Sequence, residues 1–273
     1  MELCSTTFYK IALFTMIGIS NVSISDAVLA DHVECGDVIT SALVLDEDLV
    51  CDISPALTVV GPDGRLDMSS NSVQCDGTAV GVVLEGRAAL LRAGSVSDCD
   101  IGISAEGDGF HNVQSMTTSA NSIAGIELVS NSTYLTGSTS KSNTGSGLII
   151  SGQRSNVFQN TFEENSLSGI QIDGDRSYVT ENFCFQNAGS GIVLNDTDNS
   201  WIVENASENN GTPGAGTAGI IVNAFDQQYN LIILNVGILN VDYDAQDLNS
   251  DPCNSTILRT VLGGEIGRNQ GRI

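Results

Sequence analysis

A glycine followed by an aliphatic residue recurs along this chain at nearly constant spacing. The pair occurs at seven glycines, with steps of 21, 23, 22, 22, 22 and 28 residues: Gly81, Gly102, Gly125, Gly147, Gly169, Gly191 and Gly219. A sustained period of this length predicts stacked copies of one structural unit, each burying its apolar face against the next. The longest step contains the glycine-rich stretch Gly211–Gly216, which we interpret as an inserted loop.

Two further columns of residues keep the same phase. One is aliphatic and one is polar: Leu90, Val113, Leu135, Val157, Val179, Ile202 and Ile232, and then Asp98, Asn121, Asn143, Asn165, Asn187 and Asn210. Within a unit the apolar residues alternate at period two, in pieces too short and too rich in Gly, Ser and Asn for helices, which predicts several short strands. Parallel pairing would place each aliphatic side chain about 4.8 Å from the next. It would also let the asparagines hydrogen-bond as a ladder.

These features predict an all-β fold, a right-handed parallel β-helix forming a single solenoid of about nine coils. A leucine-rich repeat has a similar period, but these units carry one or two leucines and place glycine where that motif needs leucine. We expect a signal peptide at 1–30, an N-terminal cap at 31–56, repeats at 57–244, and a C-terminal cap or tail at 245–273.

The N-terminus is typical of an exported protein. A short apolar run follows Lys10, and the small residues up to Ala30 suit a cleavage site, with an uncleaved anchor as the alternative. The rest of the chain has no apolar stretch that approaches the ~20 residues needed to span a bilayer. We therefore expect a secreted protein without a membrane span in the mature chain.

If the protein is exported, its cysteines are expected to form disulfides, because disulfides persist in oxidising compartments. Six cysteines follow the signal, without the paired spacing of a zinc site. We prefer the pairs Cys35–Cys51 and Cys75–Cys99, and interpret Cys184 as a buried thiol. Among the glycosylation sequons we select three: Asn131, Asn195 and Asn254.

The net charge of the chain limits the classes of molecule that it can bind. With 33 acidic and 10 basic residues the formal net charge is −23, which argues against nucleic acid, whose phosphates need a basic face. A solvated acidic surface that keeps an exported protein soluble explains most of this charge. The oligomeric state stays open.

At this point the chain resembles proteins with parallel β-helix repeats, the pectate-lyase-like superfamily in its broad sense. The units that carry the resemblance are GIELVSNSTYLTGSTSKSNTGS, GLIISGQRSNVFQNTFEENSLS and GIQIDGDRSYVTENFCFQNAGS. The resemblance implies the fold, and it implies activity only weakly, because the superfamily hosts lyases, hydrolases, epimerases and domains of unassigned role. The Asp-Pro-His-Glu signature of alginate epimerases is absent, since Asp251-Pro252 is followed by Cys253.

One turn carries an unusual number of charges. Asp173 and Asp175 follow the strand expected at 169–172, Arg176 comes next, and Asp196 and Asp198 should lie one coil along. Four neighbouring carboxylates would raise one another's pKa or bind a cation, for which calcium is suited, and paired carboxylates can serve acid–base work on a glycosidic bond. The alternative is an ordinary solvated turn, in which Asp and Gly are common.

An outward column beside this turn contains aromatic residues. Tyr134, Tyr178 and Trp201 each precede an inward aliphatic residue, so exposed rings would line one face and stack on sugars. Exposed strand positions also suit aromatics without any ligand.

The sequence therefore favours a secreted β-helix that binds or structurally engages a polysaccharide without a recognisable catalytic motif and without a required cofactor. Two alternatives stay open. The first is a polysaccharide lyase, hydrolase or epimerase that uses the acidic turn. The second is an adhesion solenoid that uses an apolar outward column around Ile149, Val193 and Ile221.

Overall fold

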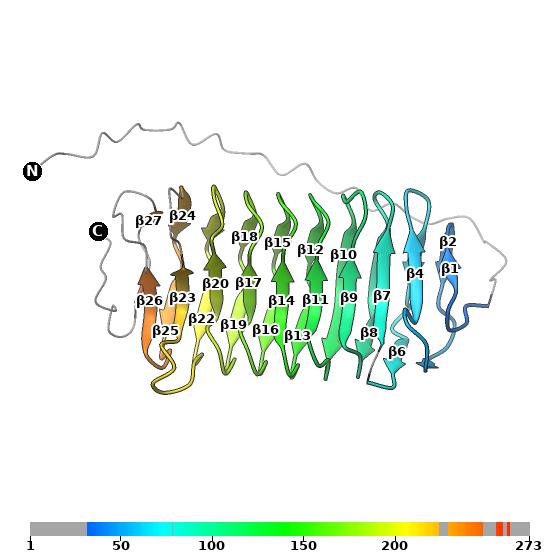
Figure 1. The fold of residues 1–273 in the computed structure, drawn as a ribbon, viewed down its shortest axis with the longest axis horizontal. Helices are drawn as coiled ribbons and strands as arrows, with labels where there is room; N and C mark the ends of the chain where they lie inside the picture. Colours follow the sequence, from blue (N-terminus) through cyan, green and yellow to red (C-terminus); the bar gives the residue numbers. More distant parts are fainter. Residues whose placement is uncertain (1–31, 78, 224–228, 248–254, 259–260, 263–273) are drawn as a thin grey trace, which may run out of the picture.

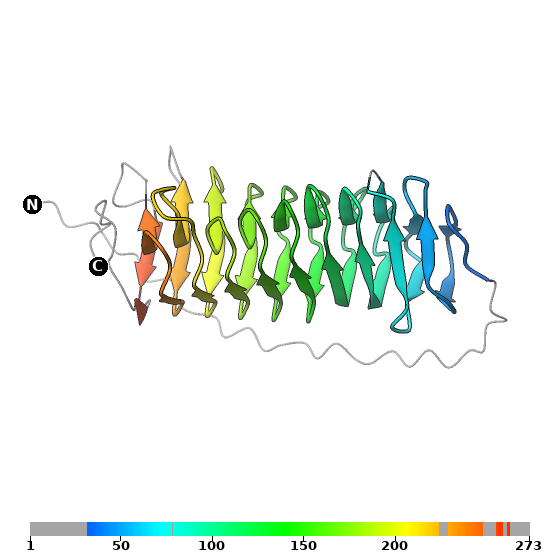
Figure 2. The same cartoon turned by 90° about the horizontal axis from the view of Figure 1, so that it is seen from below.

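Equivalent strands of successive coils pair in parallel, so the chain winds into an elongated solenoid, the right-handed parallel β-helix expected from its period (Figures 1 and 2). The structure is a computed structural model that describes residues 32–77, 79–223, 229–247, 255–258 and 261–262. Within these residues all regular secondary structure is β-strand. The expected signal peptide, Cys253 and Asn254 lie outside them.

The first sheet, sheet A, has ten strands that face the viewer in Figure 1. They are β1 (Val38–Ile39), β4 (Leu57–Val60), β7 (Val80–Glu85), β9 (Ile101–Ala105), β11 (Ala124–Leu128), β14 (Ser146–Ile150), β17 (Ile170–Ile172), β20 (Ile192–Asn195), β23 (Ala218–Asn223) and β26 (Tyr243–Asp247).

The other strands form two further walls, which β8 and β10 join by running through both. The wall that follows sheet A in each coil contains β2 (Ala42–Val44), β5 (Arg65–Asp67), β8 (Leu90–Ser97), β10 (Asn112–Ser119), β12 (Tyr134–Thr136), β15 (Asn156–Phe158), β18 (Tyr178–Thr180), β21 (Trp201–Val203), β24 (Asn230–Ile233) and β27 (Ser255–Leu258). The last wall contains β3 (Leu49–Cys51), β6 (Ser72–Cys75), β13 (Thr139–Lys141), β16 (Thr161–Glu163), β19 (Phe183–Phe185), β22 (Ala206–Glu208), β25 (Val236–Ile238) and β28 (Val261–Leu262).

The core consists of stacked aliphatic side chains, as the columns predicted. On sheet A, Leu148 pairs with Ile170 and Ile170 pairs with Ile192, and all three are fully buried. The second aliphatic column begins one residue later than expected: Leu91, not Leu90, pairs with Val113. The step from Gly102 to Gly125 is 23 residues long because the turn after Asn121 has one residue more than the equivalent turn after Cys99. A fixed count back from each glycine therefore selects Leu90 instead of Leu91.

Buried asparagines form two ladders along the solenoid. In one, the side-chain amide of Asn160 donates to Asn182, and that of Asn182 donates to Asn205, both at 3.0 Å. A second ladder runs in the same way from Asn121 through Asn143 and its successors. Each amide also accepts from the backbone N–H of the coil before it, so the coils that carry these asparagines are held in register by side-chain hydrogen bonds.

Two disulfides lie near the N-terminal end, Cys35–Cys51 and Cys75–Cys99, the pairs preferred from the sequence. Strands β1, β2 and β3 of the expected cap pair with the coil that follows. Cys184 is a buried free thiol, and its burial raises its pKa. Among the described residues, no helix is long and apolar enough to cross a membrane.

Candidate functional site

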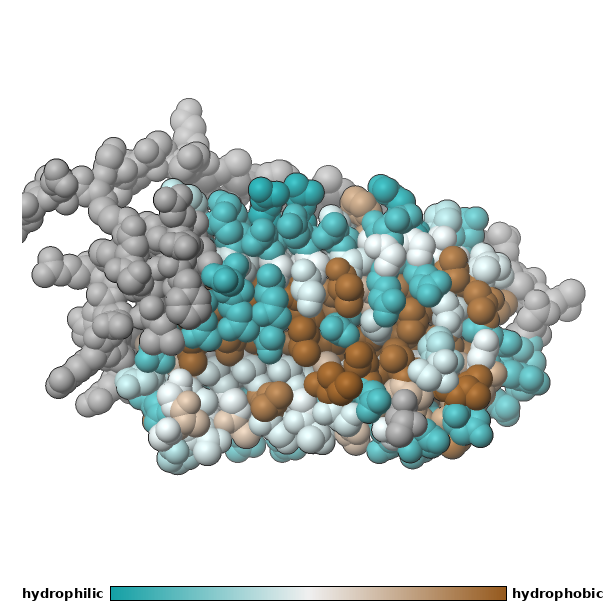
Figure 3. Space-filling view, viewed as in Figure 1, coloured by the Kyte–Doolittle hydropathy of each residue, from teal (hydrophilic) through white to brown (hydrophobic). Residues whose placement is uncertain are grey.

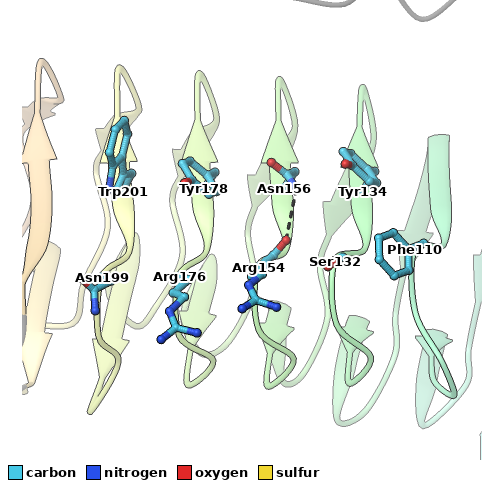
Figure 4. A pocket seen from close by; sticks show the side chains of 9 residues that line it. All are labelled: Phe110, Ser132, Tyr134, Arg154, Asn156, Arg176, Tyr178, Asn199 and Trp201. Carbon is cyan, nitrogen blue, oxygen red and sulfur yellow. Dashed lines mark hydrogen bonds between the residues drawn. The ribbon is translucent and has the colours of Figure 1, made fainter. Parts of the chain in front are cut away.

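An open groove of about 590 Å³ runs along one corner of the solenoid (Figure 4). Two columns line it, one from the corner and one from the strands β12, β15, β18 and β21. They are Phe110, Ser132, Arg154, Arg176 and Asn199, and then Tyr134, Asn156, Tyr178 and Trp201. Because equivalent strands pair in register, the groove follows the solenoid axis over five coils.

The backbone of the corner places both columns outward. Each corner residue adopts a left-handed conformation, with φ near 59° at Arg154 and 58° at Arg176. The following residue is buried, as at Ser155 and Ser177, and the residue after that faces outward again from the strand. The backbone N–H of Arg154 donates to the carbonyl of Asp175 at 2.9 Å, so the strained corner is held by bonds between coils.

The aromatic side chains predicted from the sequence lie in one column on this face, with Asn156 between Tyr134 and Tyr178. Tyr134, Tyr178 and Trp201 are 45%, 42% and 46% exposed. The rings of Tyr178 and Trp201 are 5.4 Å apart at their centroids and inclined by 54°. Exposed rings on a rigid surface are suited to contact the C–H faces of sugars, although the role of these residues in binding stays a prediction.

Arg154 and Arg176 form the second wall of the groove. In Figure 4 their guanidinium groups lie on the turn side of the strands, opposite the ring column. In the part of the chain that the structure describes, Arg92 pairs with Asp67 at 2.8 Å, whereas neither Arg154 nor Arg176 forms an ion pair. Both are exposed, so their N–H groups are available to a ligand.

The acidic turn lies before this corner and does not line the groove. The carboxylate of Asp173 accepts hydrogen bonds from the side chains of Gln171 at 2.8 Å and Asn195 at 3.0 Å. Asn195 therefore occupies the place beside Asp173 that the sequence suggested for Asp196. The extra residue of this turn, Asp196, adopts φ 50°.

The second pair of aspartates is neighbouring, as expected. The carboxylate of Asp175 accepts from the backbone N–H of Asp198 at 3.0 Å, and that of Asp198 accepts from the N–H of Tyr229 at 3.0 Å. Across the described ranges, no three His, Cys, Asp or Glu side chains are arranged to hold a metal ion, those of this turn included. The geometry shows carboxylates that satisfy backbone and amide donors, and their catalytic and calcium-binding roles stay predictions.

The sequons differ in accessibility. Asn131 is exposed and lies just before the groove, with its side-chain oxygen accepting from the N–H of Gln153 at 2.8 Å. The amide of Asn195 is engaged with Asp173 and Asn223. Asn205 and Asn210, which also begin Asn-X-Ser/Thr sequons, are buried in the ladders.

The outward column of sheet A is only partly apolar. Ile149 and Val193 are half-buried, Ile221 is 6% exposed, and Glu127 lies between Ser104 and Ile149. Burial, and secondarily the charge of Glu106, raises the pKa of Glu127. Figure 3 shows apolar patches on this face interrupted by hydrophilic side chains.

Sequence reasoning missed the corner column as a wall of the groove. Arg154 and Arg176 lie 22 residues apart, and Phe110 lies 22 before Ser132, so the period itself contained the signal. The period did not reveal that the residue two positions before each outward strand residue is left-handed and also points outward, as Arg154 does before Asn156.

Solved structures with the same fold include alginate-modifying proteins. The A-module of the Azotobacter vinelandii mannuronan C-5 epimerase AlgE4 has a TM-score of 0.64 and 12% sequence identity over 85% of this chain and 83% of the module. The periplasmic alginate epimerase AlgG has a TM-score of 0.57 and 13% sequence identity over 82% of this chain and 60% of its own. At such identities the likeness concerns the fold. No curated protein matches the sequence.

A family model matches most of the solenoid. The model is described as "Periplasmic copper-binding protein (NosD)" and covers residues 58–236, from β4 to the start of β25. This range is more than half of the chain, and it contains the whole groove. The protein therefore belongs to the NosD family of parallel β-helix proteins.

Proposed function

We propose that this protein is an exported carbohydrate-binding solenoid that holds a polysaccharide in the corner groove without cleaving it. The observation that supports the proposal is the pairing of two columns on a rigid face: exposed rings at Tyr134, Tyr178 and Trp201, and unpaired guanidinium groups at Arg154 and Arg176. Rings stack on the apolar faces of sugars, and planar guanidinium groups donate to hydroxyl or carboxylate oxygens at the ring edges.

The structural neighbours support a polysaccharide as the ligand class, since AlgE4 is a mannuronan C-5 epimerase and AlgG is an alginate epimerase. The two disulfides are consistent with a location outside the cytoplasm. We also propose that a signal peptide directs the export of the protein and that Asn131 carries a glycan.

Copper, which the family description names, does not fit the described residues. Copper prefers imidazole, thiolate and thioether ligands. His111 is buried and uses both ring nitrogens, because Nδ1 accepts from the N–H of Ala89 and Nε2 donates to the carbonyl of Glu106. The hydrogen bond that Nδ1–H of His32 donates to the carboxylate of Asp46 raises the pKa of His32, so metal would have to displace a more tightly held proton. Cys184 lies in the apolar core.

The test is a binding screen of the purified protein against neutral and uronic polysaccharides, with and without calcium. We expect binding to at least one polysaccharide, without new reducing or unsaturated ends. The double variant Tyr178→Ala/Trp201→Ala should lose at least tenfold in affinity. Phe185→Ala is the matched control, because Phe185 lies on β19, outside the groove, and stacks on Phe183. Equal binding by the double variant and the wild type would refute the groove as the site.

A further inference from the structure

In the strand column of the groove, Tyr134 and Tyr178 lie two coils apart, with Asn156 on the coil between them. From β10 to β18 the outward residue nearest the corner alternates between amide and ring: Asn112, Tyr134, Asn156 and Tyr178. Paired residues on adjacent parallel strands are about 4.8 Å apart, so the two tyrosines are separated by about 9.6 Å. We propose that the groove binds an extended glycan ribbon with a two-sugar repeat, lying along the solenoid axis. This inference rests on the carbohydrate binding proposed above and adds the linkage class.

The geometry of equatorially linked pyranoses matches this alternation. When six-membered rings are joined by equatorial bonds at carbons 1 and 4, the chain is nearly straight and each ring is turned over relative to the one before. Each ring advances by a distance close to the rise of one coil. Every second ring therefore presents the same face, and a tyrosine at every second coil meets that face each time.

The intervening asparagines complete the match. Asn156 lies between the two tyrosines, and its side-chain amide donates to the carbonyl of Arg154 at 3.2 Å. This bond fixes the orientation of the amide and leaves its oxygen as an acceptor. A turned-over ring that presents its hydroxyl-bearing edge at this coil would meet a hydrogen-bonding group rather than a ring.

The corner column contacts the other edge of the same ribbon. Arg154 and Arg176 lie on consecutive coils, so they reach consecutive sugars, whichever face those sugars present. A glycan whose chain curves, as α-1,4-linked glucose does, would contact one tyrosine but would have turned away from the groove before it reached the next tyrosine. The straight groove therefore selects against curved chains.

Trp201 ends the alternation. It follows Tyr178 on the next strand without an amide between them, and its ring is inclined by 54° to that of Tyr178. The next residue in the column is Leu231, which is half-buried. The groove spans the five coils from Phe110 to Trp201, which corresponds to about five sugars.

The first experiment compares hexasaccharides by isothermal titration calorimetry. The β-1,4-linked probes are the hexamers of glucose, mannose and mannuronate, and the matched control is the α-1,4-linked glucose hexamer, which differs from the first only in linkage. We expect at least one β-1,4-linked hexamer to bind at least tenfold more tightly than the α-linked control. Equal or tighter binding of the control would overturn the inference while leaving carbohydrate binding intact, whereas no binding of any glycan, polymers included, would overturn both.

The second experiment uses the alternation itself. Asn156→Tyr would place a ring at every coil, and Asn156→Ala removes the amide without adding a ring. For the best β-1,4-linked hexamer, we expect Asn156→Tyr to bind at least fivefold more weakly than the wild type, and more weakly than Asn156→Ala. Tighter binding by Asn156→Tyr would contradict the inference, because affinity would then depend only on the exposed aromatic area and not on the alternation of rings and amides. Circular dichroism and the denaturant midpoint of each variant would verify that the fold is unchanged.

Discussion

Two corners of each coil have the same backbone conformation but bury different residues. At the groove corner the left-handed residues are Arg154 and Arg176, each followed by a buried serine. At the ladder corner between the other two walls they are Gln159 and Glu181, each followed by a buried asparagine. From Asn160 onward the ladder corner repeats one buried side chain, whereas the groove corner varies both its buried and its exposed residues.

This difference separates what the fold requires from what the surface is free to choose. A buried amide that bonds to the coils on both sides must be the same in each coil, because a missing member leaves donors and acceptors unpaired. The groove corner is held mainly by backbone bonds between coils, such as that from Arg176 N–H to the carbonyl of Asp198. Its side chains are therefore available for recognition.

The largest expected effect is on the ladder corner. Asn182→Ala removes the bond to Asn205 and leaves the N–H of Asn160 and the carbonyl of Val157 without their partner. Unpaired buried groups cost about 1–3 kcal/mol each, so we expect a loss of about 3 kcal/mol or more. Urea unfolding followed by circular dichroism measures it. A loss below about 1 kcal/mol would mean that the ladders do not hold the coils.

The groove corner should show its own pH dependence through His111, which heads its buried column. Burial lowers the pKa of His111 below the ordinary 6.5, against smaller raising contributions from the hydrogen bond to the carbonyl of Glu106 and from the charge of Asp108. The unfolded chain therefore binds the proton more readily than the folded chain, and stability falls as pH is lowered below about 6.5.

The measurement is the urea midpoint between pH 7.5 and 5, in the wild type and in His111→Gln, which does not titrate. The wild type should lose more of its stability over this range than the variant. His32 acts in the opposite sense, since its raised pKa makes its contribution largest at low pH. Parallel pH profiles for wild type and variant would exclude His111 as the source.

A smaller effect is expected at the buried serine of the groove corner. Ser177 donates from its hydroxyl to the carbonyl of Gly174 at 3.2 Å, in the same coil as Asn182. Ser177→Ala loses this one bond, which is worth about 1 kcal/mol. If urea unfolding finds Ser177→Ala as destabilising as Asn182→Ala, the proposed contrast between the corners disappears.

The smallest stability effect is expected at the exposed left-handed residues. Arg176→Ala and Glu181→Ala, one from each corner of a single coil, should each change the unfolding free energy by less than about 0.5 kcal/mol. Only Arg176→Ala should weaken glycan binding, severalfold in calorimetry. Similar weakening by Glu181→Ala would point to general surface charge instead of the groove.

The sequence predicted the fold because the buried columns repeat. Each coil must place Leu, Ile or Val over the same residue types. The glycine before them recurs because a side chain there would meet another wall of the solenoid, as Gly125 would meet Ser140 on β13 of the same coil. The same columns placed Tyr134, Tyr178 and Trp201 on one face. Leu90 and Asp196 were misplaced where a single extra residue lies in a turn, since alternation cannot show which residue a turn absorbs.

The candidate site was predicted less completely than the fold. The acidic turn attracted attention by its composition, yet the aspartates bond to neighbouring amides and backbone groups. Phe110 and Arg154 face the groove only because they themselves adopt a left-handed conformation, and nothing in their local sequence predicts that conformation.

The asparagine ladders have a consequence for how this surface could evolve. Because strand pairing and the amide hydrogen bonds between coils fix the rise of the solenoid, two surface groups at equivalent positions of different coils are separated along the axis by a whole number of coil rises. Substitution can change which coils carry a ring, but it cannot shift a ring by a fraction of a coil. A related solenoid would therefore adapt to a ligand of different repeat in discrete steps, by moving a tyrosine one coil along, and ligands between those steps would be out of its reach.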